Sequence, residues 1–177
     1  MFHHFVGENL SRSERIERIV LEEILNSKVP DSNRENSIAW ELKHSSGVIQ
    51  FARVLALKRE LDLEKAVVGA ALHDISAIRS GKYAEHAVKG AEIARTILLK
   101  EGFSETECNE ICDAIASHSD KLTVSKNALS ELIKDADLFD CLLYDKNIYY
   151  EKPKDVQEAI KNRFRRICKE LGIRCFI

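Results

Sequence analysis

A histidine and an aspartate, His73 and Asp74, stand side by side near the end of the apolar segment AVVGAALHDIS (66–76). An ionised carboxylate is costly to bury unless it has an ion-pair partner, hydrogen bonds or a metal ion. Asp74 therefore needs such a partner, and other residues of the chain must supply it.

Three further histidines fall on the apolar face of a predicted helix. His44 comes four residues after Trp40 and four before Val48, so these three side chains share one helix face. His86 begins the apolar stripe of one later helix, and His118 ends the stripe of another. Three more helices thus direct a histidine toward the interior, in addition to the His-Asp pair.

The segment KDADLFD (134–140) inserts three aspartates into an otherwise apolar helix, and at least one of them must have a partner. A lone inward histidine is usually a hydrogen-bonded core residue. Here four of the six histidines point inward together with one or more aspartates. This conjunction predicts a buried metal ion. His3 and His4, close to the N-terminus, are left out of the predicted site.

The elements that must position these residues are all predicted to be helices. Only two prolines and seven glycines interrupt the chain, and apolar residues recur at steps of three and four. Ser104 and Glu107 have the spacing of a capping box, and Gly102 is expected to end the preceding helix. The predicted helices span residues 12–27, 34–60, 63–74, 84–101, 104–119, 127–145 and 154–171.

These helices are expected to form a single all-α bundle of about seven helices with a buried metal site. Residues 1–33 are predicted to be an N-terminal helical extension and 34–146 the metal-binding core. Residues 147–177 are predicted to be a linker and a helix packed on that core, with the linker in NIYYEKPKD (147–155). The segment SAIRSGKY (76–83) carries Ser, Gly and two cations, so it is predicted to be a loop at the mouth of the site.

Charge and composition argue against several classes of protein. The 177 residues include 27 basic and 29 acidic side chains, and a net charge of -2 does not attract nucleic acid or an anionic membrane. The basic run KNRFRRICK (161–169) could contact a nucleotide or a nucleic acid, but such a run on a terminal helix is more often a solvated face. No apolar run approaches the roughly 20 residues of a membrane span, and the N-terminus lacks the layout of a signal peptide, so a cytoplasmic location is expected.

The five cysteines are odd in number and form no CxxC motif, which predicts reduced thiols and neither a disulfide framework nor a zinc knuckle. Cys108 and Cys112 share a helix face, and this spacing is interpreted as packing.

The ordered set of histidines and aspartates resembles the HD superfamily of metal-dependent phosphohydrolases. That pattern consists of an isolated histidine, a His-Asp pair and a distant aspartate, which would here be His44, His73 with Asp74, and Asp137. The segments HAVKGAEIA (86–94) and AIASHSD (114–120) are similar to the HDIG-type branch, in which one histidine heads a helix and another ends the next.

This resemblance covers about residues 38–145. The chain departs from it at Ala77, where several hydrolytic branches carry Glu or Lys, and at Ser76, where the HDIG form has Gly. The departures concern the substrate more than the metal site.

The resemblance implies one or two divalent transition-metal ions, among Fe, Mn, Ni, Co and Zn. The implied ligands are His44, His73, Asp74, His86, His118 and Asp137. Two ions could lie about 3.5–4 Å apart, bridged by a water and by the catalytic residue Asp74. The expected reaction is hydrolysis of a phosphoester, of a nucleotide or a related small molecule, by a metal-activated hydroxide, and either a monoester or a diester fits.

Three cations are predicted to bind the phosphate of the substrate. Arg79 and Lys82 lie in the segment that follows Asp74 directly, and Lys121 follows His118 after two residues. Each could equally serve only to keep a loop soluble. Because Ala77 cannot act as a general acid, the candidates for that role are Asp135, Asp140 and a metal-bound water.

Two other functions use the same kind of ligand set. One is a di-iron oxygenase, which iron content and oxygen uptake would distinguish from a hydrolase. The other is a metal-binding regulatory protein without turnover, with which Ala77 is compatible. The expected partner is a small-molecule phosphate ester, the chain could form a homodimer, and neither a membrane nor a nucleic acid is expected.

Overall fold

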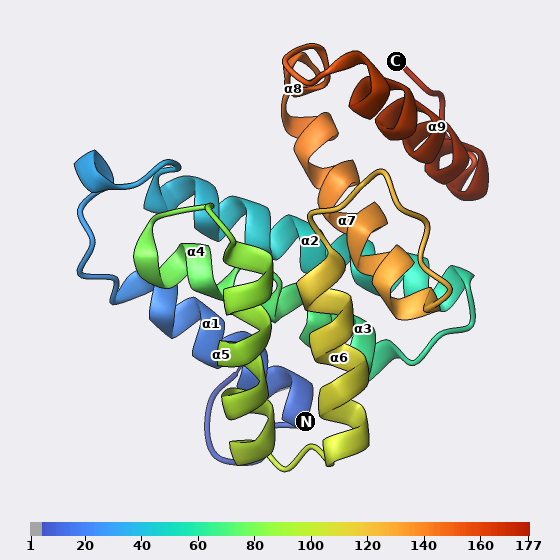
Figure 1. The fold of residues 1–177 in the computed structure, drawn as a ribbon. Helices are drawn as coiled ribbons and strands as arrows, with labels where there is room; N and C mark the ends of the chain where they lie inside the picture. Colours follow the sequence, from blue (N-terminus) through green and yellow to red (C-terminus); the bar gives the residue numbers. More distant parts are fainter. Residues whose placement is uncertain (1–4) are drawn as a thin grey trace.

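A computed structural model describes residues 5–177, and these residues form helices without any strand (Figure 1). His3 and His4 lie outside the described residues. The helices are α1 (Arg12–Leu25), α2 (Ile38–Lys58), α3 (Leu63–Leu72), α4 (Ile75–Ser80), α5 (His86–Lys100), α6 (Glu105–Ser117), α7 (Ala128–Tyr144), α8 (Asn147–Tyr150) and α9 (Lys154–Leu171), with a short 3-10 turn at Asp31–Asn33. The all-α prediction is confirmed, and each predicted helix is found.

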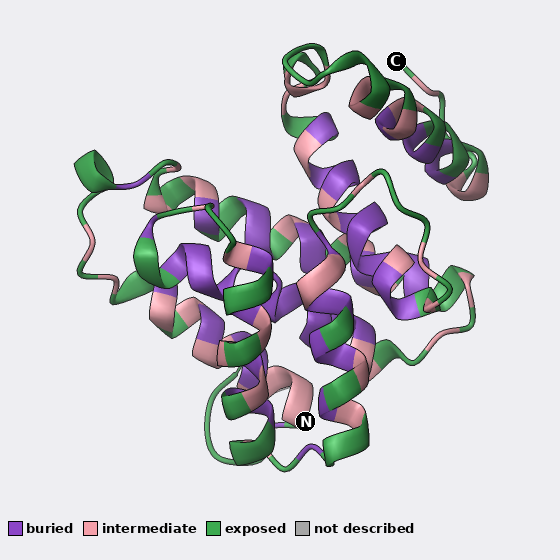
Figure 2. Ribbon diagram, in the orientation of Figure 1, coloured by how far each residue is buried: buried purple, intermediate pink, exposed green. Residues whose placement is uncertain are grey.

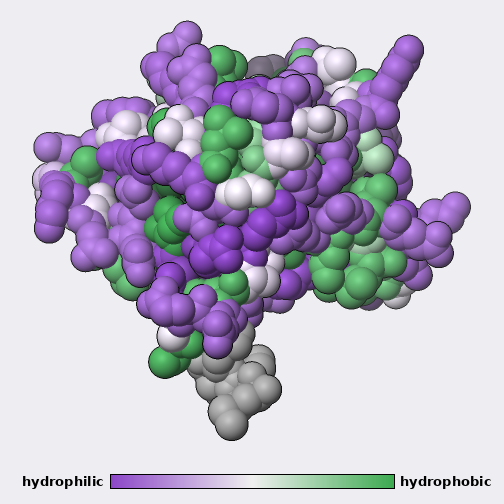
Figure 3. All heavy atoms as spheres, turned by 90° about the horizontal axis from the view of Figure 1, so that it is seen from below, coloured by the Kyte–Doolittle hydropathy of each residue, from purple (hydrophilic) through white to green (hydrophobic). Residues whose placement is uncertain are grey.

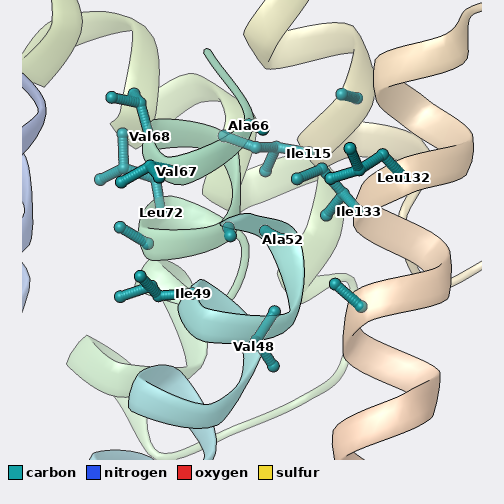
Figure 4. Packing of buried hydrophobic residues seen from close by; sticks show 14 of the residues in the cluster. Val48, Ile49, Ala52, Ala66, Val67, Val68, Leu72, Ile115, Leu132 and Ile133 are labelled. Carbon is teal, nitrogen blue, oxygen red and sulfur yellow. The ribbon is translucent and has the colours of Figure 1, made fainter. Parts of the chain in front are cut away.

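Helix α3 forms the centre of the bundle. Every residue from Ala66 to Leu72 is buried, because α1, α2, α6 and α7 all pack around this helix (Figure 2). Side chains from the surrounding helices, such as Val48, Ile115 and Ile133, fill the space beside it (Figure 4). An apolar helix with neighbours on all sides fixes the position of whatever follows its last turn. The His-Asp pair follows directly.

The helix ends agree with the local sequence. The Ser104 side chain accepts a hydrogen bond from the backbone N–H of Glu107, and the Glu107 carboxylate accepts one from the Ser104 backbone, so the predicted capping box is present. Gly102 has a φ of 84°, which glycine adopts without strain just after α5. Cys108 and Cys112 are both buried on the inner face of α6 as free thiols.

Residues 76–83 are not the loop that the sequence predicts, because most of them belong to α4. The buried side chains of Ile75 and Ile78 are three positions apart and anchor this short helix to the core. The buried guanidinium of Arg34 donates hydrogen bonds to the backbone oxygens of Ala77 and Ile78, 3.3 and 2.9 Å away. Gly81, with a φ of 72°, ends the helix. Arg34 itself is extended, and α2 begins only after the Ser37 cap.

The last helix, α9, packs against α7 (Figure 1). Phe164 of α9 is buried against Phe139 of α7, with their ring centroids 5.5 Å apart. The predicted linker before α9 contains the short helix α8. None of the helices in residues 5–177 is long and apolar enough to cross a membrane, and hydrophilic residues predominate on the face in Figure 3.

Candidate metal centre

Four histidines from four helical segments bring their Nε2 atoms together. His44 lies in the middle of α2, His73 directly follows α3, His86 begins α5 and His118 directly follows α6. The Nε2 atoms of His44 and His73 are 3.3 Å apart, and those of His86 and His118 are 3.1 Å apart. The imidazoles therefore form two close pairs.

The opposite ring nitrogen of each histidine faces a hydrogen-bond acceptor. The Nδ1 atoms of these rings lie 2.6–2.7 Å from the Asp140 carboxylate (His44) and from the backbone oxygens of Ala70 (His73), Tyr83 (His86) and Ile115 (His118). An acceptor at Nδ1 keeps the proton there and leaves the Nε2 lone pair free. Two lone pairs that face each other at about 3 Å repel unless a cation lies between them, so this arrangement fits metal ligation.

Asp74 lies between the two imidazole pairs. Its Oδ1 is 3.2 Å from Nε2 of His86 and 3.3 Å from Nε2 of His118. Its Oδ2 is 3.3 Å from Nε2 of His73 and 3.7 Å from Nε2 of His44. The carboxylate is buried, and Oδ1 has no hydrogen-bond donor. A buried oxygen surrounded by lone pairs fits coordination to a metal ion.

Asp137 completes the set from α7. Its Oδ1 is 3.3 Å from Nε2 of His44, and its Oδ2 accepts a hydrogen bond of 2.6 Å from Nζ of Lys121. Lys121 also donates to the backbone oxygen of His118, 2.6 Å away, so this lysine is held beside the site. Ligand atoms of His44, His73 and Asp137 lie within 4.8 Å of one another, as do those of His73, Asp74 and His118. Imidazole with carboxylate suits a divalent transition metal.

The electrostatics of the site favour positive charge. Burial acts to raise the pKa of Asp74, but the adjacent histidines outweigh burial and hold that pKa well below its ordinary value. Burial likewise acts to lower the pKa of His44, but Asp137 and Asp140 hold it well above its ordinary value. Both directions indicate a place where a cation, either protons or a metal ion, is stabilised.

A cavity of about 650 Å³ is lined by five of the six candidate ligands, namely His44, Asp74, His86, His118 and Asp137. Two lysines, Lys121 and Lys152, are among the residues that line it. Its apolar wall includes Leu138 of α7 and Ile148, Val156 and Ile160 of the C-terminal segment. The cavity therefore joins the candidate metal ligands to a surface that is partly cationic and partly apolar.

Two of the predicted phosphate-binding cations lie elsewhere. Arg79 is on α4, and its guanidinium pairs with Glu23 of α1 at 2.5 Å beside a different surface pocket. Lys82 is exposed and does not line the cavity. Because α4 is a helix, its turn directs Arg79 toward α1. Among the three predicted cations, Lys121 alone lines the cavity.

The two aspartates considered as general acids are also placed outside the cavity lining. Asp135 points toward α9 and binds arginines, and Asp140 contacts the Nδ1 side of His44. Ala77, where related sequences carry Glu or Lys, is buried.

Lys152 and Glu41 were not among the site residues predicted from the sequence. Lys152 lies between α8 and α9, and its position depends on how α9 packs, for which the sequence has no signal. Glu41 is buried three residues before His44 and accepts a hydrogen bond of 3.1 Å from the Tyr83 hydroxyl. Burial, and next the charge of Asp74, raise the pKa of Glu41. The three-residue spacing from His44 was the available signal, because it places both side chains on one helix face.

Comparison with known families identifies the domain that carries these residues. The model of the HD domain matches residues 42–145, which is more than half of the chain and includes all six candidate ligands. The chain belongs to the HD domain family. This family is metal-dependent, and the resemblance inferred from the sequence is confirmed.

Two curated proteins are similar to parts of this HD domain protein. Ribonuclease Y of Lawsonia intracellularis (strain PHE/MN1-00) is 32% identical over 96 residues, which cover 54% of this chain and 17% of the relative. "Putative phosphohydrolase YueE" of Bacillus subtilis (strain 168) is 30% identical over 112 residues, which cover 55% of this chain and 64% of the relative. The chain thus spans less than two thirds of either relative.

A solved structure shares the fold over almost the whole chain. The crystal structure of a predicted HD superfamily hydrolase from an uncultured Thermotogales bacterium superposes with a TM-score of 0.64 at 22% identity. The match covers 97% of this chain and 96% of that chain, so the similarity includes α1 and α9, which lie outside the residues matched to the HD domain.

Proposed function

We propose that this HD domain protein is a metal-dependent phosphohydrolase that acts on a small phosphoester. The observation that carries the proposal is the buried Asp74 carboxylate, which lies between two pairs of imidazole Nε2 atoms and has no donor on Oδ1. A single carboxylate with one oxygen toward each pair is suited to hold two ions side by side.

The six ligands divide naturally between two ion positions. His44, His73 and Asp137 would hold one ion, His86 and His118 the other, and Asp74 both. Divalent ions at such positions polarise a phosphoryl oxygen and activate water as a nucleophile near neutral pH. The chain's own contribution is to fix the donor atoms: each Nδ1 bond keeps an imidazole in one tautomer and one orientation.

The cavity surface is suited to bind a phosphoester that has an apolar or planar part. Lys121 and Lys152 can compensate phosphate charge, and the wall of Ile148, Val156 and Ile160 can cover an apolar group. A nucleotide or a related small molecule has both features. The cavity volume of about 650 Å³ suits such a molecule, and a short oligonucleotide would extend beyond the cavity.

Tyr83 is the neutral hydroxyl at the edge of this cavity. Burial raises its pKa, so the hydroxyl keeps its proton, and it donates to the buried Glu41 at 3.1 Å. We infer that Tyr83 helps to orient the substrate near His86, whose ring centroid is 5.0 Å from that of Tyr83.

The test is an assay of metal-reconstituted protein against a panel of phosphoesters. The protein would be loaded separately with Mn, Co, Ni, Fe and Zn, and the panel would include nucleoside monophosphates, a cyclic nucleotide, a dinucleoside polyphosphate and a short oligonucleotide. We expect release of phosphate or of a phosphomonoester with at least one metal. Metal-loaded protein that hydrolyses none of these esters would contradict the proposal, and oxygen uptake by the iron form would indicate an oxygenase instead.

A substitution in the cavity and a control outside it test whether the substrate binds in this cavity. Lys152→Ala should raise KM about tenfold, because a charge-assisted contact to phosphate is worth roughly 1.5 kcal/mol. Arg79→Ala combined with Lys82→Ala is the control, because neither side chain lines the cavity. Equal effects in the two variants would mean that the substrate does not occupy this cavity.

A further inference from the structure

His44 differs from the other three histidines in where it lies on its helix. His73 and His118 follow the last residues of α3 and α6, and His86 is the first residue of α5. At such ends the backbone oxygen three residues earlier lies within hydrogen-bond distance of Nδ1. His44 lies in the interior of α2, where backbone oxygens already accept hydrogen bonds within the helix. Its Nδ1 has an acceptor from another helix instead.

Asp140 of α7 supplies that acceptor. Its Oδ2 is 2.7 Å from Nδ1 of His44, and both of its oxygens accept hydrogen bonds from Nζ of Lys43, at 2.9 and 2.8 Å. Asp140 is buried, whereas the Lys43 side chain is 42% exposed. His44 is thus the one histidine of the four whose Nδ1 faces a carboxylate.

A glycine on α2 makes room for this carboxylate. A Cβ atom at Gly47 would lie 2.0 Å from Oδ1 and 2.7 Å from Cγ of Asp140. Glycine weakens a helix interior relative to alanine, so its presence here requires a reason. The close approach of Asp140 to α2, which its contact with His44 requires, supplies that reason.

We propose that Asp140 is a positioning residue that fixes His44 and strengthens it as a metal ligand. An anionic acceptor at Nδ1 raises the electron density at Nε2 more than a neutral backbone oxygen does. The ion at His44, His73 and Asp137 is therefore bound more tightly than the ion at His86 and His118, where both imidazoles rely on backbone oxygens. This inference rests on the metal centre of the proposed function and is independent of its substrate.

Three variants separate this role from a structural ion pair between α2 and α7. Asp140→Ala removes the acceptor, Asp140→Asn keeps an acceptor oxygen without the charge, and Lys43→Ala removes the cation but leaves the bond to His44. Affinity for Co²⁺ would be measured by competition with a chromophoric chelator, together with the visible spectrum of the bound cobalt and the number of ions per chain.

We expect Asp140→Ala to weaken the tighter Co²⁺ site 10- to 100-fold and to change its spectrum. Asp140→Asn should be intermediate, and Lys43→Ala should stay within about threefold of wild type. Gly47→Ala should reproduce the loss without altering Asp140 itself, because its methyl group displaces the carboxylate. Thermal unfolding of the metal-free proteins identifies any variant that fails to fold. If Asp140→Ala does not fold, Asp140→Asn replaces it in each comparison below.

Two results would overturn the inference: wild-type cobalt affinity in folded Asp140→Ala and Gly47→Ala, or an equal loss in Lys43→Ala and Asp140→Ala. Phosphoester hydrolysis would be measured on the same samples. A wild-type protein that binds cobalt but hydrolyses nothing contradicts the proposed function alone, because the order of cobalt affinities still tests Asp140.

Discussion

Helix α7 directs acidic side chains into two regions of opposite character. On one side Asp135 binds the guanidinium groups of Arg59, Arg163 and Arg166, with N–O distances of 2.7–2.9 Å. On the other side, two residues along, Asp137 faces Nε2 of His44 at 3.3 Å. The same residue type on one helix thus takes part in an ion-pair cluster and in a candidate metal site.

The difference lies in which cations the chain itself provides. In the cluster around Asp135, the neighbouring Glu131 and Glu170 also pair with the arginines, so carboxylates and guanidinium groups balance. At the metal site Asp74 faces only imidazoles, whose Nε2 atoms carry lone pairs. A buried acid that guanidinium groups already neutralise stabilises the fold, whereas one that faces only imidazole nitrogens is placed to bind an external cation.

The largest expected effect is that of Asp74→Ala, which should abolish metal binding. Asp74 is the one carboxylate that faces both imidazole pairs. Without it, the two ion positions no longer share a negatively charged ligand. Elemental analysis of the purified variant after reconstitution measures this directly. A full metal complement in Asp74→Ala would show that Asp74, like Asp135, stabilises the fold and is not a metal ligand.

The double substitution of His86→Ala with His118→Ala should halve the metal content. Two ligands of the second ion are removed, while His44, His73 and Asp137 remain for the first. The variant should bind one ion per chain, fold normally and lose most of its activity. Two ions in this variant, or a single ion in fully reconstituted wild type, would contradict the binuclear arrangement.

Asp135→Ala should reverse this pattern by costing stability and leaving metal binding intact. Removing one partner of a buried ion pair costs about 3 kcal/mol, at the lower end of the usual range because the half-exposed Arg166 can turn to water. Denaturant unfolding of the metal-free protein gives the loss, and elemental analysis of the folded variant gives the metal content. If Asp135→Ala loses metal but no stability, Asp135 is not a purely structural residue, and the contrast with the candidate metal site is wrong.

The smallest expected effect concerns pH and Glu131. Burial acts to raise the pKa of Glu131, but its bond to Arg163 outweighs burial and lowers that pKa below the ordinary 4.5. A lowered pKa in the folded state stabilises the protein fully above pH 4.5, and the contribution is lost as pH falls through the lower value. Between pH 5 and pH 3, metal-free wild type should therefore lose more stability than Glu131→Gln. Parallel curves would show that this pair makes no pH-dependent contribution.

The helices could be predicted from the sequence, and the inward histidines could be proposed as ligands, because both inferences depend on local periodicity, whereas Asp137 was chosen from the family resemblance. His44 lies four residues from Trp40 and from Val48, so one apolar face determines its direction. The buried Asp74 needed a partner of some kind whatever the tertiary arrangement. These inferences require only helix geometry and the cost of burying charge.

What the sequence could not predict depends on how helices pack. The segment after Asp74 has the composition of a loop, yet two isoleucines anchor it as α4 and direct Arg79 toward Glu23 on another helix. Asp135, Asp137 and Asp140 are alike in sequence, and their partners depend on which neighbour each side of α7 meets. The contact between Gly47 and Asp140 likewise exists only once α2 and α7 are packed together.

The C-terminal wall of the cavity has a consequence for how this protein could diversify. Ile148, Lys152, Val156 and Ile160 all lie beyond the residues matched to the HD domain, whereas all six candidate ligands lie within them. One part of the surface that would contact the substrate therefore lies outside the matched residues, whereas Tyr83, Lys121 and Leu138 lie within them together with the ligands. Exchange of residues 146–177 would therefore change this wall of the cavity and none of the six candidate ligands.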